Sequence, residues 1–177
     1  MCYYCFVTEE RLHDLPKGEN MRTETVNGVF SFPVPDDFGK MTEEQLRKHY
    51  STTENLVGFY RKEDNSMINV GFTPKKLLLS MMLSAEDILK TYDAGFSKRL
   101  NNYTRTGRIT AVIAGMTCPG MSFEYNTQLE NVPMKAEVWS IKHKGAFYAV
   151  IFIVRRTDGQ DLEKLSAGVL PYIRFEE

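Results

Sequence analysis

The chain has 177 residues, of which 42% are hydrophobic and 25% are charged, with a formal net charge of -1 and 3 cysteines. This length and composition fit one folded domain that needs no staple, and they argue against wholesale disorder. The lack of a basic excess argues against nucleic acid as a partner. The few cysteines argue against a disulfide framework and favour a reducing compartment, so we expect a cytoplasmic protein unless a signal or lipoprotein leader has been trimmed from it.

The first part of the chain lacks a hydrophobic period. Residues 1–25 are polar and mixed, and we expect them to form an arm or peripheral element ahead of a single domain over residues 26–177. No apolar run approaches the ~18 residues of a membrane span, so we expect none.

The opening MCYYC sets Cys2 and Cys5 with two residues between them. A structural zinc site needs four nitrogen or sulfur ligands, and here His13 and the distant Cys118 or His49 would have to complete the set. A redox pair of this spacing normally follows a strand and begins a helix, and nothing precedes Cys2 that supplies such a strand. We predict that the pair binds no metal and is not needed for folding.

The first half of the domain shows three local signals. In VFSFPVPDDF, apolar residues alternate from Phe30, and the prolines that follow lack a backbone donor, which predicts a short edge strand. Thr42 and Gln45 have the spacing of a capping box, which predicts a short helix. The segment LVGFYRKEDNSMINVGF predicts a hairpin with its turn at residues 63–66.

A long helix is predicted from Ser84, which forms a capping pair with Asp87. One stripe of this helix is apolar: Ala85, Ile88, Leu89, Tyr92, Phe96 and Leu100. Strands then follow without an intervening helix, in RTGRITAVIAG, GMSFEYNTQL, PMKAEVWSIKH and AFYAVIFIV. Alternation in GMSFEYNTQL predicts one buried face: Met121, Phe123, Tyr125, Thr127 and Leu129. The segment AFYAVIFIV is apolar throughout, which predicts a central strand, reached through a turn at Lys144–Gly145.

A terminal helix is predicted after residue 156. Thr157 and Gln160 offer a cap, and an apolar stripe recurs at helical spacing until Pro171 stops or kinks the helix: Leu162, Leu165, Val169 and Tyr172. Short turns between successive strands predict an antiparallel sheet, and the apolar central strand requires cover on both faces. The predicted fold class is therefore α+β, an antiparallel sheet flanked by helices on both faces, as an α/β/α sandwich.

This order of elements resembles the PsbP-like fold family, which includes the extrinsic subunit of photosystem II, a Ran-binding import factor and DcrB-like bacterial proteins. The resemblance covers about residues 26–175 and rests on VFSFPVPDDF, the hairpin, the long helix SAEDILKTYDAGFSKRL and the ending KGAFYAVIFIVRRTDGQDLEKLSAGVLPYIRF. It implies a binding or assembly-supporting role and brings no catalytic residue.

The run KKLLLSMML is either part of the core or an exposed patch for a partner, because Leu and Met suit adaptable surfaces. The candidate partner-binding residues are Leu77, Leu78, Leu79, Met81, Met82 and Trp139. Trp139 has two readings, an interface anchor or a core residue under the terminal helix.

The chain carries no nucleophile elbow, phosphate loop, zinc-protease helix or EF-hand loop, so we expect no catalytic residue, no metal and no cofactor. The leading hypothesis is a non-enzymatic binding or assembly-supporting protein, whose partner is another protein or a second copy in a homodimer. The alternative is a small-molecule-binding protein or an unrecognised enzyme, with a pocket between sheet and helix lined by Tyr125, Trp139 and Tyr148.

Overall fold

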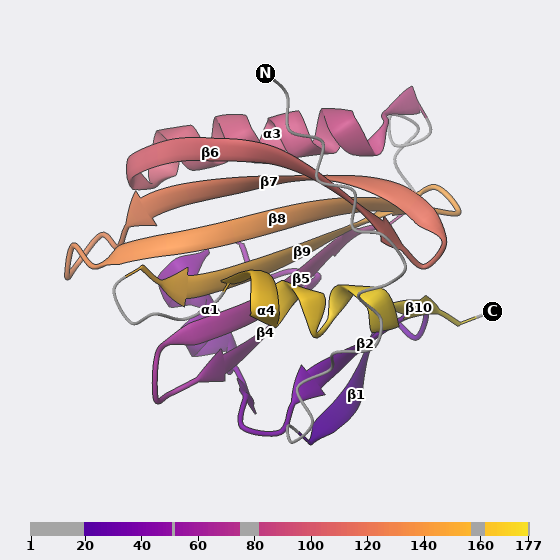
Figure 1. Ribbon diagram of the computed structural model, residues 1–177, viewed down its shortest axis with the longest axis horizontal. Coiled ribbons are helices and arrows are strands. Elements are labelled where there is room, and N and C mark those ends of the chain that lie inside the picture. The colour runs from indigo at the N-terminus through magenta and orange to yellow at the C-terminus, as the bar shows by residue number, and fades with distance from the viewer. Residues whose placement is uncertain (1–19, 51, 75–81, 157–161, 177) are drawn as a thin grey trace.

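The computed structural model describes residues 20–50, 52–74, 82–156 and 162–176. Its centre is a seven-stranded antiparallel sheet in the order β3-β4-β5-β9-β8-β7-β6 (Figure 1). The strands are β3 (Gly39–Lys40), β4 (Leu56–Arg61), β5 (Ser66–Thr73), β6 (Asn101–Ile113), β7 (Met116–Asn126), β8 (Pro133–His143) and β9 (Ala146–Arg155). The predicted hairpin over residues 56–72 is confirmed as β4 and β5.

The central position of β9 confirms the prediction from its apolar sequence. It lies between β5 and β8, and its side chains alternate between two hydrophobic clusters. Val150 and Phe152 point to one face, and Ile151 and Ile153 point to the other. Both faces of the sheet are therefore covered, as a strand without polar positions requires.

In the described part of the chain, α3 and α1 cover one face of the sheet. In α3 (Ala85–Arg99) and α1 (Glu43–His49) the N-cap residues Ser84 and Thr42 complete both bonds of their predicted capping boxes. The long helix α3 packs over β8, β7 and β6, with Leu89 fully buried, while α1 inserts Leu46. Each cap satisfies backbone donors that would otherwise be unpaired, which fixes where each helix begins.

The opposite face is covered by α4 (Leu162–Ala167), a short 3₁₀ helix η2 (Leu170–Tyr172) and a three-stranded sheet in the order β1-β2-β10. This arrangement confirms helices on both faces. The helical part is shorter than the apolar stripe predicted, because the chain turns at Gly168 and Pro171 lies within η2. The proposed cap at Thr157 and Gln160 lies outside the described residues.

The small sheet differs from expectation in two respects. Its strands are β1 (Met21–Val26), β2 (Phe30–Pro35) and β10 (Arg174–Phe175). The segment predicted as an edge strand, β2, lies in the middle, because β10 pairs only with Phe30 and Ser31 and leaves both prolines beside β1 alone. Strand β1 begins at Met21, within the stretch expected to form the arm.

The buried face predicted for residues 121–129 ends early. Met121 and Phe123 are buried, but β7 stops at Asn126 and the side chain of Leu129 is 99% exposed. After Asn126 the chain turns through a loop in which Asn131 has a positive φ of 54°. The prediction that Leu129 is buried was therefore wrong, because side chains alternate between the two faces of a sheet only as far as the strand extends.

Candidate functional site

Of the candidate partner-binding residues, Met82 lies on the surface. Its side chain is 86% exposed, and Leu83 beside it is also exposed. The position of this pair is fixed, because Ser84 caps α3 and the Leu83 carbonyl accepts a hydrogen bond from Lys142 Nζ at 2.6 Å. Leu77, Leu78, Leu79 and Met81 lie outside the described residues.

Val112 adds a third exposed apolar side chain at the same end of the sheet, with 64% of its side chain exposed. Its neighbours Ala111 and Ile113 pack in the hydrophobic cluster on the face covered by α4 and the small sheet. Because side chains alternate along a strand, Val112 points to the other face, the one covered by α3. On that same side Arg108 forms an ion pair with Glu86 in the first turn of α3. Figure 1 shows the start of α3 and the β6–β7 turn at one end of the molecule. We call Met82 and Leu83 the α3 entry surface; Val112 lies on the edge strand β6 at the same end of the sheet.

Trp139 lies in the core rather than on the surface. It is 5% exposed, and its indole Nε1 donates to Glu137 Oε2 at 3.3 Å. A Cβ added to Gly120 would lie 2.7 Å from the indole, so the ring rests directly on the β7 backbone. Trp139 is therefore a core residue and not an exposed anchor for a partner.

The three residues expected to line a pocket do not face one another. Trp139 and Tyr148 belong to the cluster under α4 and the small sheet, whereas Tyr125 packs in the cluster under α3 and α1. Tyr148 stacks on Phe30 with a ring-centroid distance of 4.8 Å and receives a hydrogen bond from Asn27 Nδ2 at 3.0 Å. The sheet itself separates Tyr125 from the other two.

Two hollows flank α1 and open to the surface. One, of about 750 Å³, is lined by Leu46, Tyr50 and Leu56 together with polar residues of α1 and of the chain after it. The other, of about 280 Å³, lies between α1, the β4–β5 hairpin and the chain before β8. Its lining includes apolar residues, Met41, Met67 and Met134, and charged residues of both signs, Lys48, Arg155 and Glu130.

Polar groups converge on the sheet face beside these hollows. Burial raises the pKa of Tyr50, Tyr92 and Tyr125, and Tyr125 and Tyr92 also raise the pKa of Tyr50 electrostatically. These phenols therefore remain neutral hydroxyls at physiological pH. Asn69 is fully buried, and neither its Oδ1 nor its Nδ2 has a hydrogen-bond partner. Sequence reasoning missed Asn69, because a single Asn in an apolar strand gives no sign of which way it points.

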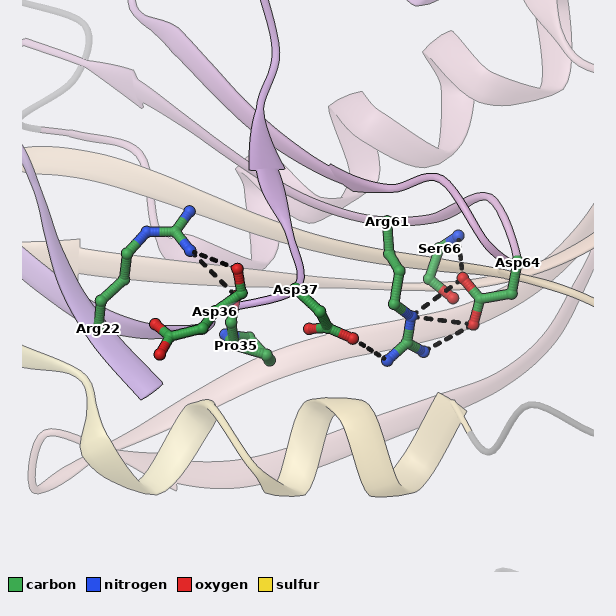
Figure 2. Close-up of polar contacts among 7 residues, drawn as sticks. All are labelled: Arg22, Pro35, Asp36, Asp37, Arg61, Asp64 and Ser66. Atoms are coloured by element: carbon green, nitrogen blue, oxygen red, sulfur yellow. Dashed lines mark hydrogen bonds and ion pairs between the residues drawn. The ribbon is translucent and has the colours of Figure 1, made fainter. Parts of the chain in front are cut away.

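The VFSFPVPDDF motif has a structural role. Arg61 Nη1 donates to Asp37 Oδ2 at 3.1 Å and Nη2 donates to Asp64 Oδ2 at 2.6 Å, so the guanidinium joins the β2–β3 loop to the β4–β5 turn (Figure 2). Arg22 donates to the carbonyl of Pro35 at 3.1 Å and to that of Phe38 at 2.6 Å. Both arginines form hydrogen bonds with groups of this same chain, so they hold neighbouring loops together and do not form an open ligand site.

Cys118 and the described histidines do not form a catalytic group. Burial raises the pKa of the Cys118 thiol to about 11, so it is not a ready nucleophile. Burial and neighbouring lysines lower the pKa of His49 and of His143, whose ring stacks on Phe175 at 3.8 Å. Within the described ranges, no group of three or more His, Cys, Asp or Glu side chains could hold a metal ion. The MCYYC pair lies outside those ranges, so its lack of metal stays a prediction.

Comparison with known proteins identifies the fold. No protein-family model and no curated protein sequence matches the chain. The solution structure of cyanobacterial PsbP from Synechocystis sp. PCC 6803 has a TM-score of 0.53 at 11% identity, over 92% of this chain and 99% of that one. LpqN, involved in cell envelope biogenesis of Mycobacterium tuberculosis, has a TM-score of 0.55 at 15% identity, over 90% and 91% of the two chains.

A longer protein from Bacteroides thetaiotaomicron VPI-5482 has a TM-score of 0.56 at 12% identity over 84% of this chain. The match covers 45% of that protein, so the present chain spans less than half of its length. At these identities the likeness shows the fold alone, and the chain has the PsbP-like fold. In the part of the chain that the structure describes, no helix has the length and apolar character needed to cross a membrane.

Proposed function

We propose that this protein is a non-enzymatic binding or assembly-supporting protein that acts through the α3 entry surface. The observation that carries the proposal is the exposure of Met82 at a fixed position. Side chains of Met adapt to varied apolar partners, and this one lies directly before the capped start of α3. The proposal includes a reducing compartment, which the 3 cysteines support.

The surroundings of Met82 support a protein partner. Leu83 extends the apolar surface, while Lys142 is bonded to the Leu83 carbonyl and Arg108 is bonded to Glu86 in the first turn of α3. An apolar centre with polar groups at its rim is the usual composition of an interface. LpqN, which has the same fold, is involved in cell envelope biogenesis, and this is in keeping with an assembly-supporting role.

The experiment is a quantitative co-purification from native cells with Met82→Asp and a matched control, Leu129→Asp. Leu129 is an exposed apolar residue elsewhere on the surface, in the loop before β8. We expect a defined protein to be retained by the parent and by the control, and its recovery to fall at least tenfold with Met82→Asp, about 1.4 kcal/mol of binding. If Met82→Asp keeps every partner while its melting temperature is unchanged, the proposal fails.

A second candidate function is the binding of a small apolar anion in the 280 Å³ hollow beside α1. The buried methionines of that hollow suit an apolar body, and Lys48 suits an anionic group. The fully buried, unpaired amide of Asn69 lies next to Met41, because a Cβ on Gly58 would touch both.

The probe for this candidate is the fluorophore 1-anilinonaphthalene-8-sulfonate, an apolar anion. We expect Lys48→Glu to weaken its binding several-fold and Met82→Asp to leave it unchanged. The reverse pattern would place the probe on the α3 entry surface and refute the hollow as its site.

A further inference from the structure

We propose that the C-terminal half of β6 pairs edge to edge with the same strand of a second copy of this chain. The inference goes beyond the proposed function, since it uses the sheet edge rather than the α3 entry surface as a partner-binding site. Strand β6 is the longest strand and the last in the order of the large sheet, paired on one side with β7. Among the described residues no backbone group pairs with its outer side.

The β6–β7 turn determines which backbone groups of β6 point outward. Ile113 pairs with Met116 around a two-residue turn, Ala114–Gly115, whose φ values of 49° and 76° are those of a type I′ hairpin. Residues that flank such a turn exchange both hydrogen bonds, and the pattern repeats at every second residue. Ile113, Ala111 and Ile109 therefore bond to β7.

It follows that the N–H and C=O groups of Arg108, Thr110 and Val112 point away from the sheet. Pro119 supports this register. It lies opposite Thr110, at a position where β7 needs no donor toward β6. The outer edge thus offers three alternate residues whose backbone N–H and C=O groups a neighbouring strand can pair with.

Most sheet edges in this protein are protected against such pairing. Strand β3, at the other edge of the large sheet, has two residues, and β1 carries the ion pair Arg22–Glu24. The first half of β6 has two register shifts, between Asn101 and Thr104 and between Arg105 and Gly107. Bulges, charges and short length are the devices that natural sheets use to prevent edge pairing.

The second half of β6 has neither a bulge nor a short length, and Arg108 at its start is its one charged residue. Its pairing with β7 is regular from Gly107 to Ile113, and no charge occurs from Ile109 to Thr117. Ile109, Thr110 and Val112 are β-branched, which favours an extended strand. An unprotected edge of this composition is a site for strand addition.

The occupant is a second copy because this edge complements itself. With Thr110 opposite Thr110 of the second copy, each Arg108 faces a Val112, so no like charges meet. All three outward pairs can then exchange two hydrogen bonds. The aliphatic part of Arg108 would cover the exposed Val112 of the other copy on the α3 side of the sheet. Because a single strand edge buries much less than the ~800 Å² per partner of a stable interface, we expect a weak, concentration-dependent dimer.

The test combines analytical ultracentrifugation with amide exchange measured by NMR, each over a range of protein concentrations. We expect the mass to rise from that of the 20.4 kDa chain toward its dimer. We also expect the amides of Arg108, Thr110 and Val112 to gain protection as concentration rises, while those of Ile109 and Ala111 are protected throughout.

Two variants and one control complete the test. Thr110→Pro removes an outward donor without breaking the β7 ladder, and Val112→Lys places like charges on the edge; each should weaken the dimer at least tenfold. Thr117→Lys adds the same charge on the paired residue of β7, away from the edge, and should dimerise as the parent does.

The proposal is overturned by a monomer at every concentration, by protection that does not depend on concentration, or by a dimer that both edge variants leave intact. A dimer dissolved by Met82→Asp alone would also overturn it, because the α3 entry surface would then be the interface. Loss of dimer in Val112→Lys with retained binding of the partner identified through Met82 would confirm that the two surfaces act separately.

Discussion

Replacing Asn69 by Leu tests whether the unpaired amide under α1 destabilises the fold. The two side chains have nearly the same shape, and Asn69 is fully buried beside Met41 and Leu46. In the folded state its Oδ1 and Nδ2 make no hydrogen bond, although both are hydrated when the chain unfolds. The substitution therefore removes a desolvation penalty without removing a bond.

The magnitude follows from the cost of burying an unsatisfied polar group, about 1–3 kcal/mol. Crowding by the extra hydrogens of Leu reduces the gain, so we expect the free energy of unfolding to rise by roughly 1–2 kcal/mol. For a chain of this size that corresponds to an increase in melting temperature of roughly 2–8 °C. Urea unfolding followed by circular dichroism measures the free energy, and an unchanged m value shows that the folded and unfolded states stay comparable.

Asn69→Asp is the matched control at the same position. An isolated carboxylate in this site has its pKa raised by burial, so the folded state binds the proton more tightly than the unfolded state. The variant should be destabilised at pH 7 and recover stability as pH falls, opposite to an ordinary surface carboxylate. If Asn69→Leu lowers stability by more than ~1 kcal/mol, the amide has a partner in solution and the reasoning is refuted.

Three further predictions concern local packing, the arginine network and the buried thiol. Gly58→Ala should cost about 1–3 kcal/mol, because the new Cβ would lie 2.5 Å from Asn69 Oδ1 and 2.7 Å from Leu46 Cδ2; a double variant with Asn69→Ala should recover part of this loss, and strict additivity would contradict the clash. Burial alone would raise the pKa of Asp64, but hydrogen bonds from Arg61 and from the Ser66 backbone outweigh it, so the pKa lies below its ordinary value. The resulting stability is present above the ordinary Asp range near ~4 and is lost as pH falls through the lower, folded pKa. Asp64→Asn should lower stability at pH 7 by about 1.5–3 kcal/mol and remove this part of the acid dependence, and an unchanged profile would show that the network adds nothing. Cys118 should react with a disulfide reagent at pH 8 only on unfolding in a Cys2→Ser, Cys5→Ser variant, because burial raises its pKa to about 11; fast reaction of the folded protein would contradict its burial.

The elements that sequence alone predicted are those with local signals. Both capping boxes form as the spacing of Thr42–Gln45 and Ser84–Asp87 indicated, because cap and helix are only a few residues apart. Strand β9 was placed correctly at the centre, because a segment without polar positions can be satisfied only by cover on both faces. These inferences required no knowledge of distant contacts.

The parts that sequence could not predict depend on contacts between distant residues. Strand β1 has an unremarkable composition, and its place is fixed by Arg22 reaching the carbonyls of Pro35 and Phe38. The middle position of β2 depends on two residues at the far end of the chain, in β10. The separation of Tyr125 from Trp139 and Tyr148 depends on which face of the sheet each strand presents, and pairing sets that register.

The pairing of β5 with β9 has a consequence for how this chain folds. Every other neighbouring pair in the large sheet joins strands that follow one another along the chain, with α1 between β3 and β4. The β5–β9 pair joins Thr73 to Phe147, so its loop contains α3 and three strands. Hairpins close quickly, whereas bringing such distant segments together carries the largest loop-closure entropy in the sheet. We therefore expect the β3–β5 and β6–β9 blocks to collapse separately, and their joining along Val70 and Val150 to set the rate at which the native protein appears.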